Sequence, residues 1–296
     1  MFCKLKSSDW FHEDGFPISV EWRNPQESFP PHTHDFSEIV IVTGGKGMHV
    51  TGKESWALRA GDVFVIGGAR AHVYRDLDGL KLVNVLFRPD LIRLQTIDLP
   101  RMPGHHALFT LEPNCRRQHG FKSWLRLTPG ELGAVLGLVE QLDLELSQRK
   151  PGFGFMATAF FMQLVGWLSR HYGSSRHADT HNLLRLAKTI AYLETNFHET
   201  LDLESLAKMA GMSKRSFLRA FQAGVGLTPI AYLIQLRVNR AAAMLRSGTE
   251  NITEVAFRCG FADSNYFTRQ FKQIMGQSPR RYRQLAFSGA KQISSS

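Results

Sequence analysis

The sequence is poor in cysteine: it has only three, Cys3, Cys115 and Cys259, and they lie far apart. So few and scattered thiols exclude a disulfide framework, and their spacing does not match a metal site built from cysteines. The first 15 residues also lack the apolar core of a secretory signal peptide. Together these absences predict a protein of the reducing cytoplasm.

A long hydrophobic run is also missing. No charged residue lies between Lys150 and Arg170, but Pro151, Gly152 and Gln163 interrupt that stretch. The unbroken apolar part is therefore shorter than the roughly 20 residues that cross a bilayer. We expect a buried helix here and no membrane partner.

Acidic residues are fewer than basic ones: 26 Asp and Glu stand against 36 Lys and Arg, for a net charge of +10. Residues 183–287 hold 15 of the basic and 7 of the acidic side chains, so most of the excess falls in a third of the chain. The polar residues 173–182 precede this segment and are predicted to form a linker. Such a charge favours a polyanionic partner, although a solvated helical surface would carry the same charge.

The basic third contains an internal repeat. Residues 206–229 read LAKMAGMSKRSFLRAFQAGVGLTP, and residues 255–279 read VAFRCGFADSNYFTRQFKQIMGQSP. Four residues recur 50 positions later: Phe217, Phe221, Gly226 and Pro229 return as Phe267, Phe271, Gly276 and Pro279. Two copies are too few for a solenoid and indicate a duplicated two-helix unit.

Each copy has the signals of a helix, a tight turn and a second helix. Asp202 is placed to cap the first helix of copy one, and Asn251 with Glu254 has the pattern of a capping box in copy two. The expected turn glycines and the caps of the second helices are Gly211, Gly260, Ser213 and Asp263. A helix–turn–helix unit places its second helix in the major groove of DNA.

The second helix of each unit is predicted to bury its phenylalanines and to turn polar side chains outward. Arginine hydrogen-bonds the O6 and N7 atoms of guanine, and asparagine the N6 and N7 atoms of adenine. The outward side chains are Arg215, Arg219 and Gln222 in copy one and Asn265, Arg269 and Lys272 in copy two, flanked by Lys214, Ser264 and Thr268. For Gln222 and Lys272, a phosphate contact or plain solvation stays open beside base contact.

Between the two units, residues 230–246 are predicted to form one helix that ends near Gly248. A rigid helix there would fix the separation of the two reading helices. Two helices on one face of DNA need a spacing near one helical turn, roughly 34 Å, or a local bend of the DNA.

The run CGFADSNYFTRQFKQIMGQSPRRYR resembles the signature of the AraC/XylS family of bacterial transcription regulators, and the resemblance extends over about residues 181–285. It implies a seven-helix domain that inserts two helices into successive segments of the major groove. The base-reading positions of the family then fall on Arg215, Leu218, Arg219, Asn265, Thr268 and Arg269. Leu218 has no hydrogen-bonding group, so only an apolar contact, as with a thymine methyl group, is open to it.

Residues 37–89 have a different pattern, with the short apolar runs EIVIV, GMHV, DVFVI, AHVYR and LKLVNVLF. Glycine-containing segments such as TGGKG and TGKES separate these runs and are predicted to be turns. The even spacing predicts an antiparallel β-sandwich or barrel.

Residues 128–172 are helical in pattern, and Pro151 with Gly152 breaks them into an antiparallel pair. The first helix of the pair carries an apolar stripe made of Leu136, Leu138, Val139, Leu142 and Leu146. Such a stripe is either core or a dimer interface, and we favour the interface.

The β region also resembles both motifs of the cupin fold. The segment PHTHDFSEIVIVTGG has the spacing of the first motif, and GDVFVIGGARAH has part of the second. The second motif departs from the proline, glycine and asparagine of the family at Gly67, Ala69 and Asp76. The motif positions are occupied by His32, His34, Glu38, Gly45, Gly61 and His72.

Three roles are open for His32, His34, Glu38 and His72. In metal-binding cupins such residues ligate a metal, and this nitrogen and oxygen set suits iron, manganese, nickel or zinc. The metal would then serve either turnover or ligand binding and structure. The third role, which we favour, is a metal-free pocket whose imidazole and carboxylate groups bind an effector. Sugar-sensing AraC-type regulators carry such a barrel, and the layout is most similar to their rhamnose-responsive branch.

We therefore expect an α+β multidomain chain. Residues 1–127 form a cupin-like, effector-sensing β-barrel, 128–172 a dimerising helical pair, 173–182 a linker, 183–287 the double helix–turn–helix domain and 288–296 a tail. The expected function is a transcription regulator, an activator by family resemblance, which binds promoter DNA, a small molecule that we take to be a sugar, RNA polymerase and a second copy of itself. The alternatives are a cupin oxygenase or isomerase with a fused DNA-binding module, and an architectural DNA-binding protein without a sensor.

Overall fold

The computed structural model describes residues 3–52, 54–67, 71–92, 98–115, 125–174, 178–247 and 249–285. Contacts divide the chain into two compact units, Met1–Lys188 with Ala223–Val225, and Thr189–Gln222 with Gly226–Ser296. All the described strands belong to the first unit, and the described elements of the second are helices. This division confirms the predicted α+β, multidomain organisation.

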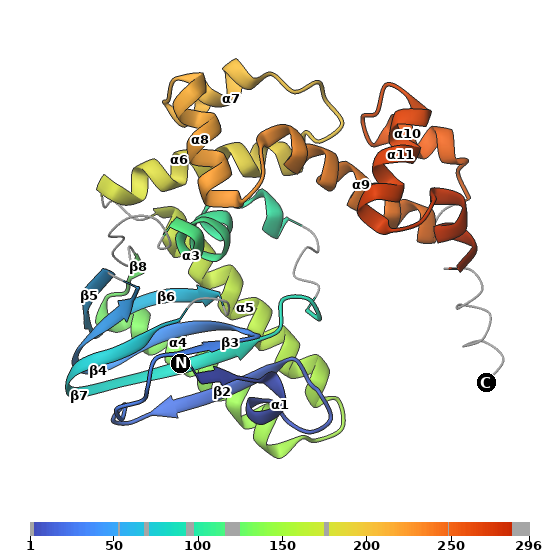
Figure 1. Cartoon of the computed structure of the whole chain (residues 1–296). Coiled ribbons are helices and arrows are strands. Elements are labelled where there is room, and N and C mark those ends of the chain that lie inside the picture. The colour runs from blue at the N-terminus through green and yellow to red at the C-terminus, as the bar shows by residue number, and fades with distance from the viewer. Residues whose placement is uncertain are drawn as a thin grey trace. The chain divides into compact units, whose positions relative to one another are not determined.

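The described strands are β1 Cys3–Leu5, β2 Ile18–Arg23, β3 His32–His34, β4 Ser37–Thr51, β5 Glu54–Arg59, β6 Asp62–Gly67, β7 Val73–Phe87 and β8 Leu125–Arg126. An antiparallel sheet has the order β2-β7-β4-β6-β8, with β5 paired to β4 (Figure 1). The predicted antiparallel sheet is confirmed, although within the described residues its pairing path is open rather than a closed ring. Strands β1 and β3 pair in parallel, which the sequence analysis did not predict.

The segment TGGKG is not a turn, contrary to the prediction. Strand β4 runs through it, and its register against β7 shifts after Val42 and after Lys46, as at β-bulges. Gly45 has φ +66°, and a Cβ atom there would lie 2.0 Å from the carbonyl oxygen of Gly79. The glycine thus permits the close approach of β7 within a bent strand. The turn predicted at TGKES is confirmed, because β4 ends at Thr51 and β5 begins at Glu54.

The first unit also contains short helical segments. Segment α1 Ser7–Trp10 precedes β2, and four others lie between β7 and β8: η1 Leu99–Arg101, α2 Pro103–His105, η2 His106–Leu111 and α3 Glu112–Cys115. Two long helices come next, α4 Pro129–Gln148 and α5 Phe153–Ser174. Thr128 and Glu131 form a capping box at the start of α4. The predicted helical pair, broken at Pro151 and Gly152, is confirmed.

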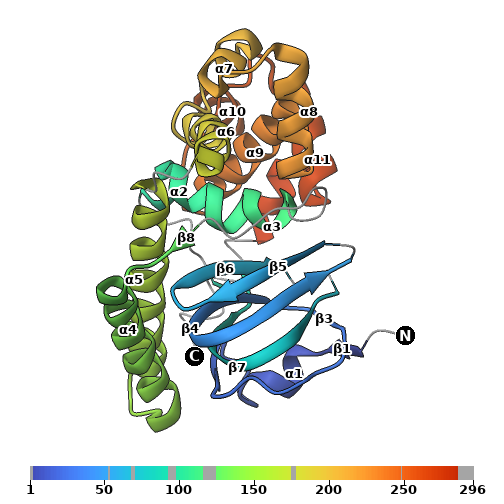
Figure 2. The same cartoon turned by 90° about the vertical axis from the view of Figure 1, so that its left-hand side faces the viewer.

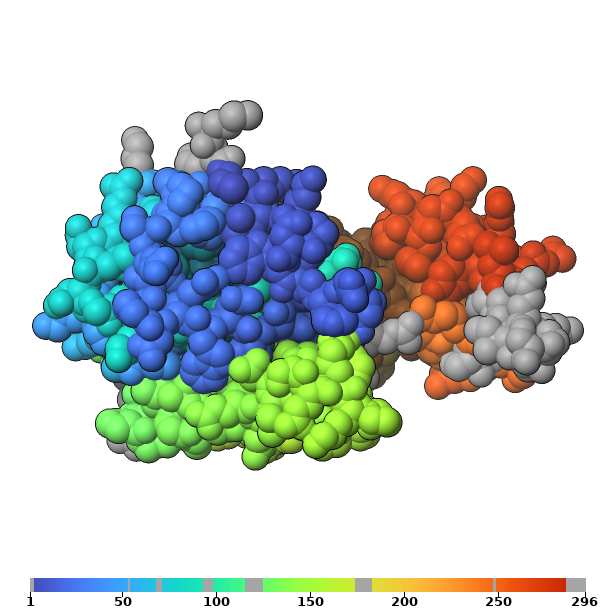
Figure 3. Space-filling view, turned by 90° about the horizontal axis from the view of Figure 1, so that it is seen from below, coloured from blue at the N-terminus to red at the C-terminus, as the bar shows by residue number. Residues whose placement is uncertain are grey.

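The helices α4 and α5 lie side by side and pack against the sheet (Figure 2). Phe161 of α5 contacts Phe87 of β7 with ring centroids 5.3 Å apart, and the indole nitrogen of Trp22 donates to Asp143 of α4 at 2.9 Å. Figure 3 shows the surface of the two helices, in green, as a layer beside the strands. This packing fixes the pair to the sheet.

Two residues of the apolar stripe predicted on the first helix of the pair belong to the core. Val139 and Leu142 are fully buried, and Leu136, Leu138 and Leu146 are partly buried. Helix α4 contacts both α5 and strand β2 of this unit. The exposed apolar side chains lie elsewhere on the pair, at Leu144, Phe155, Met156 and Met162.

The helices of the second unit are α6 Ala178–Thr195, α7 Leu203–Ala210, α8 Lys214–Val225, α9 Pro229–Ser247, α10 Ile252–Arg258 and α11 Ser264–Met275, and residues 279–285 are also helical. Helix α6 begins in the first unit and continues into the second. The helix predicted for residues 230–246 is confirmed by α9.

The linker predicted for residues 173–182 is wrong in extent. Helix α5 continues to Ser174 and α6 begins at Ala178, and only residues 175–177, which lie outside the described part, separate them. A first helical turn needs no apolar residue when the buried face begins later, here at Leu183 and Leu184. Polarity alone was therefore misleading. The predicted tail, residues 288–296, also lies outside the described residues.

No single helix in the described ranges has the length and apolar character to cross a membrane. One bent pair, Lys214–Val225 with Pro229–Arg246, passes the same test on length and composition.

Candidate DNA-binding surface and effector pocket

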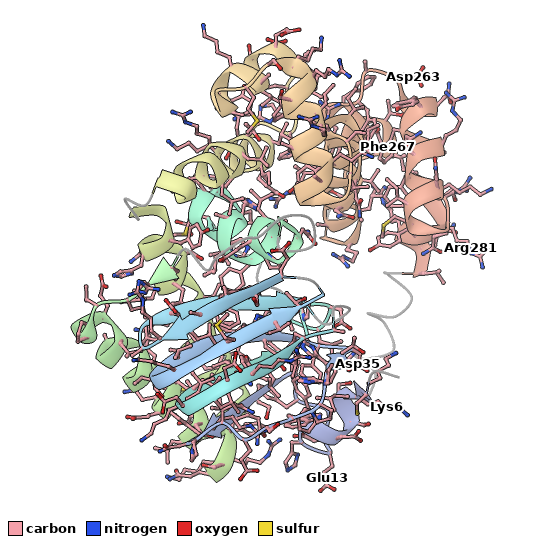
Figure 4. All side chains as sticks on the ribbon, turned by 60° about the vertical axis from the view of Figure 1, so that its left-hand side comes forward. Lys6, Glu13, Asp35, Asp263, Phe267 and Arg281 are labelled. Carbon is pink, nitrogen blue, oxygen red and sulfur yellow. The ribbon has the colours of Figure 1, made fainter. Side chains whose placement is uncertain are left out.

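The two repeats fold into the same local structure. Phe217 and Phe221 of α8 are fully buried, with ring centroids 5.6 Å apart at 64°. Phe267 and Phe271 of α11 are also fully buried, 5.5 Å apart at 64°. Figure 4 shows Phe267 directed into the helical unit and Asp263 at the start of α11. The phenylalanines therefore anchor both second helices, as predicted.

The repeat extends further than the sequence analysis recognised. Phe221 contacts Tyr232 edge to face at 5.8 Å, and Phe271 contacts Tyr282 edge to face at 5.4 Å. Tyr282 follows Tyr232 by 50 positions, the same displacement as the phenylalanines. The signal was present in the sequence, three residues beyond the proline that ends each copy.

The predicted helix caps are all formed. Asp202 accepts from the backbone of Glu204 and Ser205, and Asn251 with Glu254 makes a complete capping box. Ser213 accepts from Ser216, and Asp263 from Tyr266. These contacts satisfy backbone N–H groups that a helix start leaves without a partner.

The turn glycines have the predicted conformation. Gly211 has φ +67° and Gly260 has φ +85°. A Cβ atom at Gly260 would lie 2.7 Å from the carbonyl oxygen of His198, so the second turn also needs a small residue. The turn of copy two is one residue longer than that of copy one, because Gly260 and Asp263 are three positions apart, whereas Gly211 and Ser213 are two positions apart.

Most of the predicted DNA-contacting side chains are exposed. This group consists of Lys214, Arg215, Arg219, Gln222, Asn265, Arg269 and Lys272. Leu218, Ser264 and Thr268 are partly buried. The Thr268 hydroxyl donates to the backbone oxygen of Ser264 at 2.9 Å, so its methyl group and its lone pairs remain for a base. Lys214 lies 3.0 Å from Glu204, but both are exposed, and such a pair contributes little.

Other basic residues of this unit have structural contacts. Arg237 of α9 donates to the backbone oxygens of Phe197 and Glu199, each at 2.6 Å. Arg240 and the hydroxyl of Tyr232 both contact the carboxylate of Glu194 on α6. These contacts hold α9 against the α6 region, so part of the positive charge serves the fold. The spacing of α8 and α11 along DNA stays a prediction.

The first unit contains a cavity of about 400 Å³ at the sheet. Three of the four predicted effector residues line it: His32, Glu38 and His72. His34 does not; its side chain is fully buried and stacks on Phe36 with ring centroids 4.5 Å apart. His32 and His34 are two residues apart in β3 and therefore lie on the same face of the strand, with His34 next to the bend that leads into β4.

All four predicted residues nevertheless gather in one cluster. The backbones of His32 and His72 exchange hydrogen bonds of 3.1 and 3.0 Å, which brings their rings to 4.3 Å. Glu38 Oε1 lies 3.5 Å from His34 Nε2, and Glu38 Oε2 lies 3.9 Å from His72 Nε2. Both separations exceed an ordinary hydrogen bond between nitrogen and oxygen.

Backbone carbonyls set the tautomers of two histidines. His34 Nδ1 lies 2.6 Å from the Phe36 oxygen, and His32 Nδ1 lies 3.0 Å from the Pro30 oxygen. A carbonyl only accepts, so Nδ1 carries the proton in both rings, and Nε2 of each neutral ring offers a lone pair. Burial lowers the pKa of His34 to about 4 and also lowers the pKa of His32, so both rings are neutral at pH 7.

The carboxyl group of Glu38 is buried beside these neutral rings. Burial raises its pKa to about 8, and the positive charge of Arg23 opposes this rise. The Glu38 carboxyl group is therefore mainly protonated at pH 7 and can donate a hydrogen bond into the cavity. The cluster thus combines one donor with several imidazole acceptors.

Several cavity residues were missed by the sequence analysis. Trp10, Arg23 and Asn84 line the cavity, and Asn84 Oδ1 is buried with no hydrogen-bond partner among the described residues. Asn84 was recognisable as the polar residue inside the apolar run LVNVLF of β7. Trp10 had no such signal, because only the folded chain brings its segment to the cavity.

The N-terminal segment borders the cavity. Strand β1 pairs with β3, and the backbone N–H of Ser7 donates to Asp35 Oδ1 at 2.7 Å. Lys6 and Asp35 are near each other in Figure 4. The ring of Phe11 contacts Phe36 edge to face at 5.4 Å. These contacts place Leu5 and Trp10 at the cavity wall.

The cluster also has the composition of a metal site. The ligand atoms of His34, Glu38 and His72 lie within 4.8 Å of one another, and all three residues are buried. His34 Nε2 is a buried acceptor with no hydrogen-bond partner among the described residues. A metal ion therefore fits these residues on both chemistry and position.

Known families cover both units. A helix-turn-helix domain model matches residues 206–285, and a model of the AraC-like ligand binding domain matches residues 18–165. The HTH-type transcriptional activator RhaS of Escherichia fergusonii is 35% identical over 282 residues, which cover 95% of this chain and 97% of the relative. RhaS of Salmonella paratyphi B is 35% identical over 288 residues, which cover 95% of this chain and 96% of the relative.

Among solved structures, the DNA-binding domain of AdpA in complex with a target DNA is 35% identical to the matched part of this chain. The match covers 36% of this chain and 97% of that domain, with a TM-score of 0.35. The curated relatives are transcription regulators, which confirms the prediction that the chain is a regulator and not an enzyme. With both domains matched and a relative aligned over nearly its whole length, the chain belongs to the AraC family of transcription regulators.

Proposed function

We propose that this chain activates transcription from promoters that it binds through α8 and α11, in response to a small sugar bound in the cavity of about 400 Å³. The observation that carries the proposal is the pair of phenylalanine-anchored helices with exposed Arg219 and Arg269. The names of the curated relatives support activation, and the similarity to RhaS supports a sugar. The protein would act in the cytoplasm and contact RNA polymerase there.

The cavity has the chemistry that a sugar requires. Glu38, His32 and Asn84 offer hydrogen-bonding groups that match hydroxyls, and Trp10 and Trp22 offer apolar surface for the ring. The response would be a shift between domain arrangements, to which the effector contributes only its difference in affinity between them. The N-terminal segment is a suitable element for this coupling because it borders the cavity.

Selection of bound DNA from a random pool, by the full chain with and without L-rhamnose, tests this function. We expect a selected site with two half-sites whose spacing reflects α8 and α11, and tighter binding or an altered spacing when the sugar is present. Selection of no defined sequence under either condition would contradict the proposal.

The effector residues can be tested by a double substitution. His32→Ala with Glu38→Ala should remove the response to the effector, because it deletes two hydrogen-bonding groups of the cavity. Binding of the selected DNA without effector should stay within about threefold, since these residues belong to the other unit. Fluorescence anisotropy of labelled DNA measures both quantities. A response that persists in the variant would place the effector elsewhere.

We further propose that the chain dimerises through α5. Phe155 is 79% exposed, and Met156 and Met162 are also exposed on this helix. Phe155, Ala159 and Met162 recur at spacings of four and three residues, as in the interface of paired helices. The residues of the predicted leucine stripe on α4 are all less exposed than Phe155, Met156 and Met162 of α5.

Phe155→Glu with Met162→Glu should weaken self-association at least about 100-fold, because burial of two large apolar side chains contributes roughly 1.5–3 kcal/mol each. Sedimentation velocity over a range of concentrations measures the dissociation constant. Gln163→Glu, which adds one charge to an exposed neighbouring position, is the matched control and should stay dimeric. A wild-type chain that sediments as a monomer at high concentration would contradict the interface.

A further inference from the structure

We propose that Glu21 makes the cavity selective for uncharged sugars over sugar acids, because it holds Arg23, the cation of the cavity wall. That the effector is a sugar rests on the function proposed above. The selectivity itself rests on the charges and the hydrogen-bonding groups of strands β2 and β7, and neither Glu21 nor Arg23 was among the site residues predicted from the sequence.

The charged side chains of the cavity wall are mostly acidic. Among the described residues that line the cavity, Arg23 is the one lysine or arginine, whereas Glu21, Glu27 and Glu38 carry carboxyl groups. Burial raises the pKa of Glu38 to about 8, so this group is mainly uncharged at pH 7. The carboxylates of Glu21 and Glu27 still outnumber the charge of Arg23. An anion that enters the cavity therefore finds a favourable charge only if Arg23 is free to contact it.

Arg23 is held from two sides. Glu21 and Arg23 are two residues apart on β2, so their side chains lie on the same face of the strand. Arg23 Nη2 lies 3.3 Å from Glu21 Oε2, and the two side chains are only 35% and 31% exposed. The guanidinium carbon of Arg23 also lies 5.4 Å from the ring centroid of Trp10, within the range of a cation–π contact. The cation thus already has its partners within the protein.

The charges of Glu21 and Arg23 depend on each other. Burial raises the pKa of Glu21, and the positive charge of Arg23 opposes this rise. A ligand carboxylate that drew Arg23 away would leave the Glu21 carboxylate partly buried without its cation. Removing one partner of such a pair is costly, so the loss of the old contact would offset the gain from the new one. Glu21 therefore acts against acidic ligands, as an element that favours one ligand by penalising another.

The groups next to Glu21 favour hydroxyls. Glu21 is directly opposite Asn84 in the pairing of β2 with β7, a position in which Cβ atoms lie about 4.5–5.5 Å apart. Both residues line the cavity, and Asn84 Oδ1 is buried with no hydrogen-bond partner among the described residues. These two neighbouring acceptors need donors. A sugar hydroxyl donates to them and also accepts from protonated Glu38, whereas a carboxylate only accepts.

Binding of matched sugars tests the selectivity. D-Galactose and D-galacturonate differ only at C6, as do D-glucose and D-glucuronate, so each pair isolates the effect of a carboxylate. Isothermal titration calorimetry of the full chain with these four sugars and with L-rhamnose measures the affinities. We expect the most tightly bound neutral sugar to bind at least about tenfold more tightly than either acid.

Glu21→Gln should relax this selectivity. The substitution keeps the shape of the side chain but frees Arg23 to pair with a ligand carboxylate, so the affinity for the acids should rise about tenfold or more, and the affinity for neutral sugars should change less. Adding Arg23→Gln should remove the gain, because no cation is left for the carboxylate. Glu27→Gln is the matched control: it removes the same charge from an exposed residue of the wall and leaves the pair of Glu21 and Arg23 intact, so it should still reject the acids.

Circular dichroism checks that each variant is folded, and the comparison of sugars in the wild-type chain does not depend on any variant. A wild-type chain that bound an acid as tightly as the best neutral sugar would overturn the selectivity and leave the sugar cavity intact. Folded Glu21→Gln without a gain for the acids, or an equal gain in Glu27→Gln, would overturn the role of Glu21. A chain that bound none of the five sugars would overturn the proposed sugar function together with the selectivity that rests on it.

Discussion

Phe267→Ala is expected to destabilise the second helix–turn–helix unit by about 3–5 kcal/mol, the cost typical of removing a buried phenylalanine ring. Phe267 is fully buried and contacts both Phe261, at 5.1 Å between ring centroids, and Phe271, at 5.5 Å. These rings belong to one cluster with Val255 of α10 and Val238 of α9. The cavity left by the ring would loosen all three helices, so binding of DNA by α11 should also be lost.

Hydrogen exchange in the full chain is the suitable measurement, because a chain of two units does not unfold in one two-state step. Amides of α10 and α11 should lose protection in Phe267→Ala, and those of β4 should not. Tyr266→Ala is the matched control, since it removes a neighbouring aromatic side chain that is 38% exposed. Phe217→Ala should have the corresponding effect on α7 and α8. If the amides of α11 are as well protected in Phe267→Ala as in Tyr266→Ala, the Phe267 ring does not anchor the helix.

The DNA-binding unit was predictable because its signals are local. Asp202, Asn251, Ser213 and Asp263 cap helices within three residues of themselves, and a cap depends on neighbours in sequence rather than on distant packing. The phenylalanines were predictable because a helical period of 3.6 residues places both of each pair on one face. The duplication then supplied an internal comparison, and agreement between the copies strengthened each assignment.

The sensor unit was less predictable because its geometry depends on long-range contacts. The glycines of TGGKG suggested a turn, and only the approach of Gly79 from β7 shows why glycine is needed inside a strand. The cupin motif identified all four cluster residues, yet the sequence did not show that His34 is behind the cavity wall. Trp10 reaches the cavity only because β1 pairs with β3, and strand pairing across 29 residues leaves no mark in a local pattern.

The division of roles within the cluster has a consequence for the effector. If His34, Glu38 and His72 all bound the effector directly, each would need to line the cavity, and His34 does not. The buried side of the cluster, at His34, is therefore not open to the effector, whereas Glu38 and His72 on the cavity side are accessible to it. We therefore expect the effector to contact His32 and Glu38, which line the cavity.

The substitutions Arg219→Ala and Arg269→Ala are each expected to weaken binding of the selected DNA by about 1–3 kcal/mol, or roughly 5- to 150-fold. Both side chains are exposed on helices whose opposite faces are anchored by buried phenylalanines, so their loss should not disturb the core. The two arginines belong to separate copies of the unit and make no contact with each other among the interactions of the described residues. Their effects should therefore add, giving about 2–6 kcal/mol for the double variant.

Arg246→Ala is the matched control, because it removes the same charge from an exposed position on α9 rather than from a reading helix. Anisotropy titrations over a range of salt concentrations separate base recognition from general charge, since the loss of a phosphate contact reduces the dependence of affinity on salt. Each reading-helix variant should also lose its preference at one base pair, in a different half-site for each arginine, whereas the control should keep the wild-type preference. If all three variants lost affinity equally and kept the same preferred sequence, the arginines would contribute only charge. Sequence reading would then depend on Asn265 and the remaining outward side chains.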